Sequence, residues 1–431
     1  MVKRIYLLML AIVLLSPLIS LADVKTKIVF WHHEPPAHRV KAVQTVIDAF
    51  TSENPNIEVI QETVPWNDAW PKTLAAIGTG TTPDFQFDLP DLNMQAFEAG
   101  GLIPVTDIVK KIDTDQGYFK AVMKPYFHDG EYWGVPAWHS PIVMIYRPSL
   151  LKNYLGTDKA PKTWDELLTY SKKLTVGNIF GSGLVAGKTL CTPEQMWGFM
   201  QQAGSTLFDK DGKVDFNSPN TIKAVQFLKD LYQYSPKAAS GWSWGELEMN
   251  FPAGNIAMMP YFGAVLKTFS DENNTDLASA ELPRPKDGQR GAMVYPFGIQ
   301  IFKATEKKGQ TQLQAVKSLI MFMMSPKINY MLTAAQEPGL WYPATKANLD
   351  AKNFWEYGPH VKYREFIKPF ADTVNYGSLF GFTYGANNLA IGQISGENVL
   401  AEMFQKVVVE KMAVNKAVEW AHNRMVELSS K

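Results

Sequence analysis

The chain has 431 residues with 42 basic and 42 acidic side chains, so its formal net charge is zero. A near-neutral chain offers no electrostatic footprint for nucleic acid or anionic lipid, and we expect no nucleic-acid partner. The single cysteine, Cys191, allows neither an internal disulfide nor a cysteine-based metal cluster. The length exceeds what one hydrophobic core usually supports, and it predicts two domains.

Residues 1–22 have the pattern of a cleavable secretory signal. Two basic residues precede an apolar stretch from Ile5 to Ile19, and the small residues Ser20 and Ala22 stand at the −3 and −1 positions. The apolar stretch is short for a bilayer, which argues against a retained membrane anchor. No cysteine stands near the predicted cut, so we expect no lipid anchor. The pattern predicts a soluble chain exported to the periplasm or another extracytoplasmic space.

The region 28–104 predicts the beginning of a doubly wound α/β sheet. Strand-like apolar runs at 28–31, 57–60 and 85–88 alternate with helical spacing of apolar residues at 40–50 and 74–77. Such alternation is typical of parallel α/β sheets, which bind ligands beyond the carboxyl ends of their strands. The candidate contacts at these ends are His33, Glu34, Trp66, Asp88 and Asp91.

The later part of the chain contains segments that we interpret as crossings between two lobes. An extended segment at 136–147 is interrupted by Pro141, which indicates an edge, a bulge or a crossing. A second extended segment at 295–302 and a turn at 339–344 predict two further crossings. Thr163, with Glu166 three residues later, has the pattern of a capping box and predicts a helix start.

These segments together resemble the extracellular solute-binding proteins of ABC importers, in the branch that contains the maltose-binding and glycerol-phosphate-binding proteins. Each matching piece is short, but their order and spacing extend over essentially the whole chain after the predicted signal. The matching pieces are 49–50 with 54–59, 80–84, 99–104, 134–136 with Tyr146, 161–167, and Phe251 with Gly254 and 257–258.

The resemblance implies an α/β fold of the type II periplasmic-binding-protein class, with two lobes of helix-flanked sheets joined by crossing strands. The N-terminal lobe would comprise 23–139 plus 297–343, and the C-terminal lobe 140–296 plus 344–431. The resemblance further implies hinge closure around a ligand in the interlobe cleft and delivery to the transmembrane subunits of an ABC permease. We expect a monomer.

Both the resemblance and elementary chemistry favour a carbohydrate ligand. Aromatic planes cover the apolar face of a sugar ring, while carboxylates accept hydrogen bonds from its hydroxyl groups. Cleft residues of the family fall on strand ends and turns here. The later candidates are His139 and Ser140 at the first crossing, Trp242, Trp244 and Tyr261 in the second lobe, and Trp341 at the third crossing.

The resemblance has one local departure. Many relatives carry Gly-x-Trp after the segment that matches Ala257-Met258, whereas this chain has Gly263-Ala264-Val265. Tyr261 or Trp242 would have to replace the stacking tryptophan, so the identity of the sugar stays open.

Other interpretations stay open for some of the candidates. Asp88 or Asp91 could cap the helix that begins near Leu92, and the tryptophans could pack in cores or at a rim. His32 and His33 are adjacent, point apart and lack further spaced ligands, so we expect no metal. No cofactor is expected.

The sequence favours two other functions less. An organophosphate of the glycerol-phosphate type would need convergent cations, but Arg39, Arg147 and Arg284 are scattered; a polyol ligand also stays open. A secreted glycoside hydrolase would place paired acids on the strand ends of a barrel, whereas here the strand–helix order breaks at the crossings. No nucleophile elbow or Ser/His/Asp grouping appears, so we do not expect an enzyme.

Overall fold

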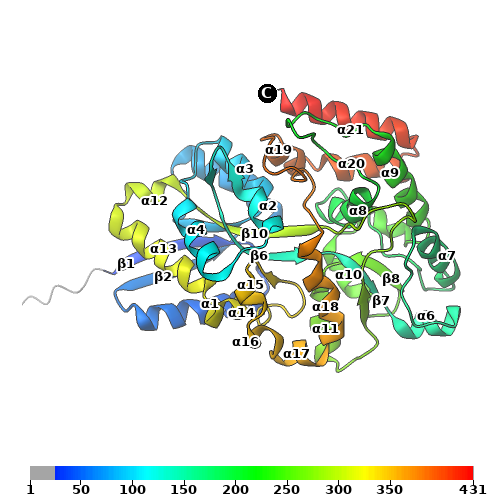
Figure 1. The fold of residues 1–431 in the computed structure, drawn as a ribbon, viewed down its shortest axis with the longest axis horizontal. Coiled ribbons are helices and arrows are strands. Elements are labelled where there is room, and N and C mark those ends of the chain that lie inside the picture. The colour runs from blue at the N-terminus through cyan, green and yellow to red at the C-terminus, as the bar shows by residue number, and fades with distance from the viewer. Residues whose placement is uncertain (1–24, 431) are drawn as a thin grey trace, which may run out of the picture.

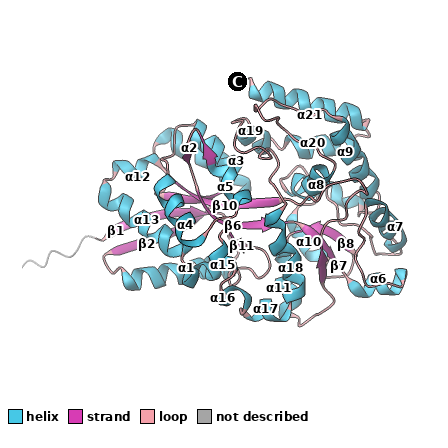
Figure 2. Ribbon diagram, viewed as in Figure 1, coloured by secondary structure: helices cyan, strands magenta, loops and turns pink. Residues whose placement is uncertain are grey.

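The computed structural model describes residues 25–430, apart from the side chain of Asn67. The predicted secretory signal at 1–22 lies outside the described residues. Two sheets, each flanked by helices, form the two halves of the molecule, and strands β6 and β10 run between them (Figures 1 and 2).

The first sheet has six strands in the order β11-β6-β10-β3-β1-β2. Strands β1, β2 and β3 are parallel, whereas β10 pairs antiparallel with β3 and β6, and β11 antiparallel with β6. The bounds are β1 (Thr26–His32), β2 (Ile57–Thr63), β3 (Phe85–Asp88), β6 (Val135–Pro141), β10 (Val294–Ile301) and β11 (Tyr342–Pro343).

The predicted strand–helix alternation at the start of the chain is confirmed. Helix α1 (Ala37–Glu53) joins β1 to β2, α2 (Trp66–Thr79) joins β2 to β3, and α3 (Pro90–Glu98) follows β3. Apolar residues at helical spacing bury one face of α1, and Phe30 of β1 stacks on Phe85 of β3 with ring centroids 4.7 Å apart. Since the three strands are parallel, their carboxyl ends meet at one edge of the sheet.

The second sheet has three antiparallel strands in the order β8-β7-β9. Their bounds are β7 (Val143–Tyr146), β8 (Met258–Tyr261) and β9 (Ala278–Ala280). Only Ile142 separates β6 of the first sheet from β7 of the second, and its amide donates to the carbonyl of Met293 beside β10. The chain therefore passes from one sheet to the other next to Pro141, as the sequence predicted.

The other helices cover both sheets. In the first half and its connections they are α4 (Thr106–Gln116), α5 (Lys120–Met123), η1 (Lys124–Tyr126), α12 (Lys303–Lys307), α13 (Gln310–Met324), α14 (Pro326–Leu332), α15 (Lys346–Leu349) and α16 (Lys352–Trp355). In the second half they are α6 (Pro148–Leu155), α7 (Trp164–Leu174), α8 (Cys191–Gln202), α9 (Pro219–Tyr232), η2 (Lys237–Gly241), α10 (Trp244–Asn250), η3 (Gly263–Val265), α11 (Leu266–Asp271), α17 (Gly358–Lys362), α18 (Arg364–Asp372), η4 (Thr373–Asn375), α19 (Ile391–Gly396), α20 (Val399–Val408) and α21 (Val414–Ser429).

The predicted helix start at Thr163 is confirmed. The Thr163 hydroxyl accepts from the Glu166 amide at 3.1 Å, and the Glu166 carboxylate accepts from the Thr163 amide at 3.3 Å. This reciprocal cap fixes where α7 begins. The aromatic ring of Trp164 then stacks on Phe227 at 4.0 Å, in the core of the second half.

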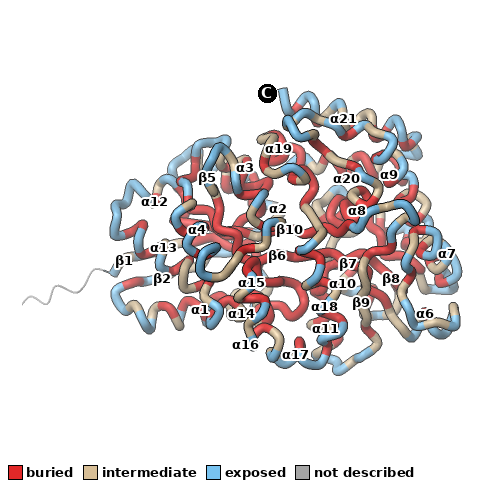
Figure 3. Tube along the Cα trace, in the orientation of Figure 1, coloured by how far each residue is buried: buried red, intermediate tan, exposed pale blue. Residues whose placement is uncertain are grey.

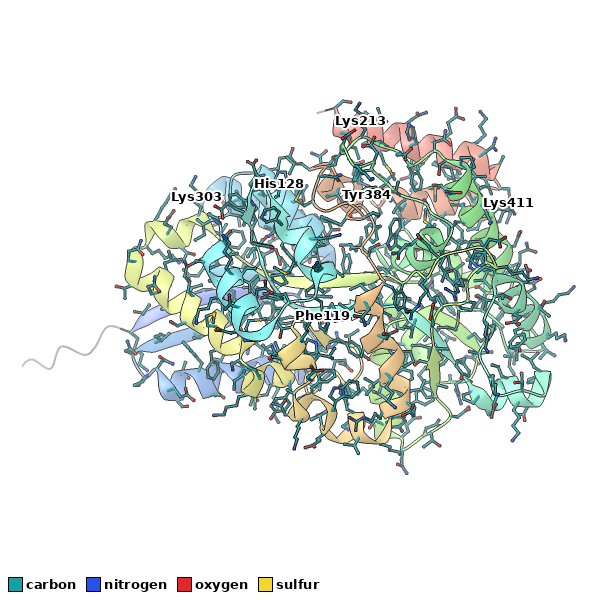
Figure 4. All side chains as sticks on the ribbon, in the orientation of Figure 1. Phe119, His128, Lys213, Lys303, Tyr384 and Lys411 are labelled. Carbon is teal, nitrogen blue, oxygen red and sulfur yellow. The ribbon has the colours of Figure 1, made fainter. Side chains whose placement is uncertain are left out.

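The predicted lobe limits stay a prediction. Helix α15, which the sequence assigned to the second lobe, packs against α14 and α4 of the first half. Strands β4 (Phe127–His128) and β5 (Glu131–Tyr132) form a short hairpin. This hairpin contacts the segment before α19, because the His128 ring forms a hydrogen bond with the Ala386 carbonyl at 2.9 Å. His128 and the neighbouring Tyr384 are labelled in Figure 4.

The two halves share a buried centre. Strands β6 and β7 are buried along their whole length, and all but one residue of β10 are buried (Figure 3). Within residues 25–430, no helix combines the length and the apolar character that crossing a bilayer requires.

Candidate ligand-binding cavity

A cavity of about 240 Å³ lies where the two halves meet. The first sheet and its connections contribute Glu34, Arg39, Trp66, Ser140, Tyr295 and Phe297, together with Pro36 and Leu89. The second half and the segment before β11 contribute Leu190, Glu194, Trp244, Glu248, Tyr261, Phe262, Leu340 and Trp341. Aromatic rings thus come from both halves, and polar side chains lie between them.

On the side of the first sheet, Glu34 and Trp66 are fixed against each other. Glu34 follows β1 and Trp66 opens α2, so both lie at carboxyl ends of parallel strands. The Trp66 indole donates to Glu34 Oε1 at 3.0 Å, and Arg39 Nη1 donates to Glu34 Oε2 at 2.5 Å. Burial raises the pKa of Glu34, while Arg39 and Trp66 oppose that rise.

Arg39 is held by a second carboxylate. Its Nε donates to Glu337 Oε2 at 2.7 Å, and its guanidinium lies 5.0 Å from the centre of the Trp341 ring. Glu337 also accepts from His38 at 2.5 Å. The cation therefore ties the start of α1 to the segment that leads into β11, and it fixes the Trp341 ring in the cavity wall.

On the side of the second half, two more carboxylates face the cavity. The Trp244 indole donates to Glu194 Oε2 at 2.7 Å, and the Tyr261 hydroxyl donates to Glu248 Oε1 at 3.0 Å. Burial raises the pKa of Glu194 to about 8, and it also raises the pKa of Glu248. Both acids hold a proton more tightly than free carboxyl groups because water is largely excluded from them.

Six of the predicted site residues line the cavity, whereas five do not. The six are Glu34, Trp66, Ser140, Trp244, Tyr261 and Trp341. The five that lie outside its lining are His33, Asp88, Asp91, His139 and Trp242.

His33 and His139 lie behind the cavity wall. His33 packs against Trp66 with ring centroids 4.2 Å apart and bonds to the Val64 carbonyl at 2.6 Å. His139 is fully buried in β6 beside Tyr342. Burial lowers the pKa of His33 to about 4 and that of His139 to about 3. His33 therefore supports Trp66 in the cavity wall, whereas His139 packs beside Tyr342, which is not part of the lining.

The two aspartates belong to buried hydrogen-bond networks. Asp88 accepts from Asn93 at 2.7 Å and from the Tyr126 hydroxyl at 3.3 Å. Asp91 accepts a hydrogen bond from the Tyr295 hydroxyl at 3.0 Å. Tyr295 lines the cavity, whereas Asp91 does not. Asp91 also lies in the first turn of α3, which favours a negative charge.

Trp242 is half-buried, packs against the hydrophobic core and does not line the cavity. Of the two residues proposed to replace the missing tryptophan of the family pattern, only Tyr261 lines the cavity. Gly263 has a different use: a Cβ there would lie 2.0 Å from the Gly339 carbonyl oxygen, so glycine permits the close approach of the two segments.

Sequence reasoning missed several lining residues, chiefly Glu194, Glu248, Tyr295 and Phe297. Glu248 could have been predicted from the sequence, because it lies four residues after Trp244 and therefore shares a face of α10 with it. Tyr295 and Phe297 alternate along β10 on one face of the strand. Glu194 gave no comparable signal, since a single acid early in a helix is usually solvated. Arg39 was considered only as a phosphate ligand.

Among residues 25–430, no group of three or more histidine, cysteine, aspartate or glutamate side chains has a metal-binding arrangement. The cavity itself offers hydrogen-bond acceptors and aromatic rings for stacking. It combines acceptor oxygens with aromatic planes, the pairing that a polyhydroxylated ligand with an apolar face requires.

Residues 36–330 match the family model described as bacterial extracellular solute-binding protein. The chain belongs to this family. The match covers more than half of the 431 residues and extends from the cavity residues near Pro36 to α14. The predicted family is thereby confirmed.

Curated relatives of this solute-binding protein are distant. A protein of Escherichia coli, YcjN, whose name describes it as an ABC-transporter periplasmic-binding protein, is 23% identical over 97% of this chain and 98% of its own length. The arabinooligosaccharide-binding protein of Halalkalibacterium halodurans is 25% identical over 60% of this chain and 58% of its own. The alignment with a binding protein of Brucella abortus spans 65% of that relative's length.

Solved structures share the fold. A solute-binding protein of Thermotoga lettingae bound with α-D-tagatose superposes with a TM-score of 0.78 at 19% identity, covering 94% of this chain and 100% of that one. A sugar transporter protein of Arthrobacter chlorophenolicus with bound laminaribiose gives 0.76 at 20% identity, covering 93% and 98%. The predicted α/β binding-protein fold is confirmed.

Proposed function

We propose that this solute-binding protein is the extracytoplasmic component of an ABC importer and binds a carbohydrate in the cavity between its two halves. The observation that carries the proposal is the composition of the cavity wall. Tryptophan rings from both halves, Trp66 and Trp244, are each fixed by a hydrogen bond to a cavity glutamate. Fixed rings can stack on a sugar face, and the remaining acceptor oxygens suit its hydroxyl groups.

Several relatives are consistent with this ligand class. The relative from Halalkalibacterium halodurans is named for arabinooligosaccharide binding, and the two similar structures hold tagatose and laminaribiose. We extend carbohydrate binding to this chain because its cavity supplies aromatic rings and hydrogen-bond acceptors.

The proposed mechanism is capture by closure. A ligand that contacts both Glu34 and Trp66 of one half and Glu194 and Trp244 of the other binds the closed form better than the open form, and this difference drives closure. The closed monomer would then deliver the sugar to the permease subunits. The expected signal at 1–22 would place the protein in the periplasm or an equivalent space, and no catalysis is proposed.

An organophosphate ligand is less favoured by the cavity. Arg39, the one basic side chain that residues 25–430 contribute to its lining, already binds Glu34 and Glu337. A phosphate entering the cavity would also meet Glu194 and Glu248, and neither side chain offers a positive charge to pair with it.

A thermal-shift screen tests the proposal. The purified protein is heated with mono-, di- and trisaccharides, polyols and sugar phosphates. A ligand that binds only the native state stabilises it by about 2.7 kcal/mol at a concentration 100 times its Kd, so the melting temperature rises measurably. We expect a rise with a carbohydrate that Trp66→Ala abolishes and Trp355→Ala, on the distant helix α16, preserves. A rise with sugar phosphates alone would contradict the proposal.

A further inference from the structure

The charged side chains that line the cavity do not balance. Among the described residues that line it, Glu34, Glu194 and Glu248 face a single basic side chain, Arg39. Arg39 is bound both to Glu34 at 2.5 Å and to Glu337, outside the lining, at 2.7 Å. Two carboxylates thus already surround the one cation, and it brings no surplus positive charge to the rest of the wall.

Glu194 and Glu248 have no ion-pair partner among residues 25–430, because each is held only by a neutral donor. Glu194 accepts from the Trp244 indole and Glu248 from the Tyr261 hydroxyl, and each of these contacts uses one carboxylate oxygen. Arg39 is near enough to favour the ionised form of Glu248, but Glu34 and Glu337 oppose that effect. Within residues 25–430, no hydrogen bond uses the second oxygen of either acid.

Holding two such acids in a cavity without a counter-charge is costly. Glu194 is 4% exposed, and burial raises its pKa to about 8, so it stays protonated near neutral pH when no cation is present. Nearby Asp91 adds to this rise. A buried carboxylate regains its charge most readily when a cation with hydrogen-bond donors lies against it.

The rest of the wall suits a cation as well. Trp66, Trp244, Tyr261 and Trp341 surround the same cavity. Aromatic faces attract an ammonium group through their quadrupoles, and the attraction grows when water is excluded. At about 240 Å³ the cavity is smaller than the usual range of about 300–1,000 Å³ for drug-sized ligands, which favours a ligand of one or two sugar rings.

We propose that the carbohydrate bound by this protein carries a protonated amine, and that Glu194 and Glu248 receive its ammonium group while the tryptophans cover the ring. This inference rests on the proposed carbohydrate function and narrows it from sugars in general to amino sugars. The ammonium group supplies three donors to acids that have oxygens to spare, and its charge balances a wall in which acidic groups are in excess.

Matched ligands test the charge directly. The purified protein is titrated calorimetrically at pH 7 with D-glucosamine, D-glucose and N-acetyl-D-glucosamine, and with the same three forms of galactose. The members of each set share a ring, but only the first carries a charged amine. We expect the amine to bind at least about tenfold more tightly than both neutral members, because the charge-assisted contacts are lost with it.

Two conservative variants test whether Glu194 and Glu248 cause the preference for the charged amine. Glu194→Gln and Glu248→Gln keep an oxygen that can accept from Trp244 and Tyr261 but remove the charge. We expect each to reduce affinity for the amine about tenfold while changing affinity for the neutral sugars less than about threefold. Glu272→Gln, at an exposed position in the second half, is the matched control and should change neither.

The outcomes distinguish failure of the amino-sugar inference from failure of the proposed carbohydrate binding. If a neutral sugar binds as tightly as its amine, or if the glutamine variants do not reduce that preference, the amino-sugar inference is overturned and carbohydrate binding stands. If neither amines nor neutral carbohydrates bind, both the inference and the proposed function fail. Even if a variant fails to fold, comparing the amine with the neutral sugars in the unaltered protein decides whether it prefers an amino sugar.

Discussion

The Trp244 indole donates a hydrogen bond to Glu194 at 2.7 Å in the wall of the cavity. On the side of the first sheet, Trp66 donates to Glu34 at 3.0 Å in the same way. Each half therefore presents a tryptophan whose ring is oriented before any ligand arrives. Orienting a side chain in advance reduces the entropy lost on binding, which raises affinity without adding a contact.

Trp244→Phe keeps an aromatic ring but removes the N–H that holds Glu194. We expect ligand affinity to fall about tenfold and the free energy of unfolding to fall by about 1–3 kcal/mol, because a buried acid loses its donor. Calorimetric titration and urea unfolding measure the two effects. Trp164→Phe is the matched control: its indole donates to Gln202 at 2.9 Å away from the cavity, so stability alone should fall. Equal losses of affinity in both variants would contradict the assigned role of Trp244.

Arg39→Met leaves Glu34 and Glu337 without their cation. We expect the free energy of unfolding at pH 7 to fall by about 3–5 kcal/mol, the usual cost of removing one partner from a buried ion pair. Arg424→Met is the control, since Arg424 also bridges two carboxylates, Glu397 and Glu427, but on the solvent-facing helix α21. That variant should unfold at the same urea concentration as the unaltered protein.

Four buried histidines each contribute stability that is lost in acid. Burial lowers the pKa values of His32, His33 and His360 to about 4 and that of His139 to about 3, from the ordinary value of 6.5. At each of these histidines the unfolded chain binds more protons than the folded chain between these values, so the stability that the histidine contributes is present above pH 6.5 and is lost as the pH falls towards 4. The raised pKa values of the buried acids Glu34, Glu194 and Glu248 act in the opposite direction. Each histidine should contribute up to about 2 kcal/mol of the loss between pH 7 and pH 5.

Urea unfolding at pH 7 and pH 5 checks this dependence. His139→Phe removes one titrating group from the buried centre of β6, so the unfolding free energy at pH 5 minus that at pH 7 should become more positive by up to about 2 kcal/mol. An unchanged difference would show that His139 does not contribute to the acid sensitivity.

Gly392 permits a close contact between the two halves. A Cβ at this position in α19 would lie 2.8 Å from the Asp91 carbonyl oxygen and 2.8 Å from Gln95 Cβ, both in α3. Helix α19 also packs against α20 and α21 of the second half. We expect Gly392→Val to push α19 from α3, increase the radius of gyration measured by X-ray scattering and weaken ligand binding. Gly78→Ala, with open space around its Cβ, should change neither quantity.

The alternation of strands and helices from β1 to β3 was predictable because apolar periodicity reports burial directly. The passage from β6 to β7 was predictable from Pro141, which cannot continue a ladder of hydrogen bonds. Trp66 and Glu34 were predictable as cavity residues because they follow parallel strands, whose ends share one edge of the sheet.

Which acidic side chains reach the cavity was less predictable. Asp88 and Glu34 both follow a strand, yet Asp88 turns to Asn93 and Tyr126 while Glu34 reaches the cavity. That choice depends on partners far along the chain, which strand and helix patterns do not reveal. Glu194 lies in the first turn of α8 and lines the cavity, and its partner Trp244 lies fifty residues later.

Calorimetric titration of the carbohydrate that gives the largest thermal shift tests the central claim most directly. The account predicts saturation at one ligand per chain and an affinity reduced at least about tenfold in Trp66→Ala, since stacking and the orientation of Glu34 are both lost. Saturation by sugar phosphates alone, no heat with any carbohydrate, or unchanged affinity in Trp66→Ala would contradict it.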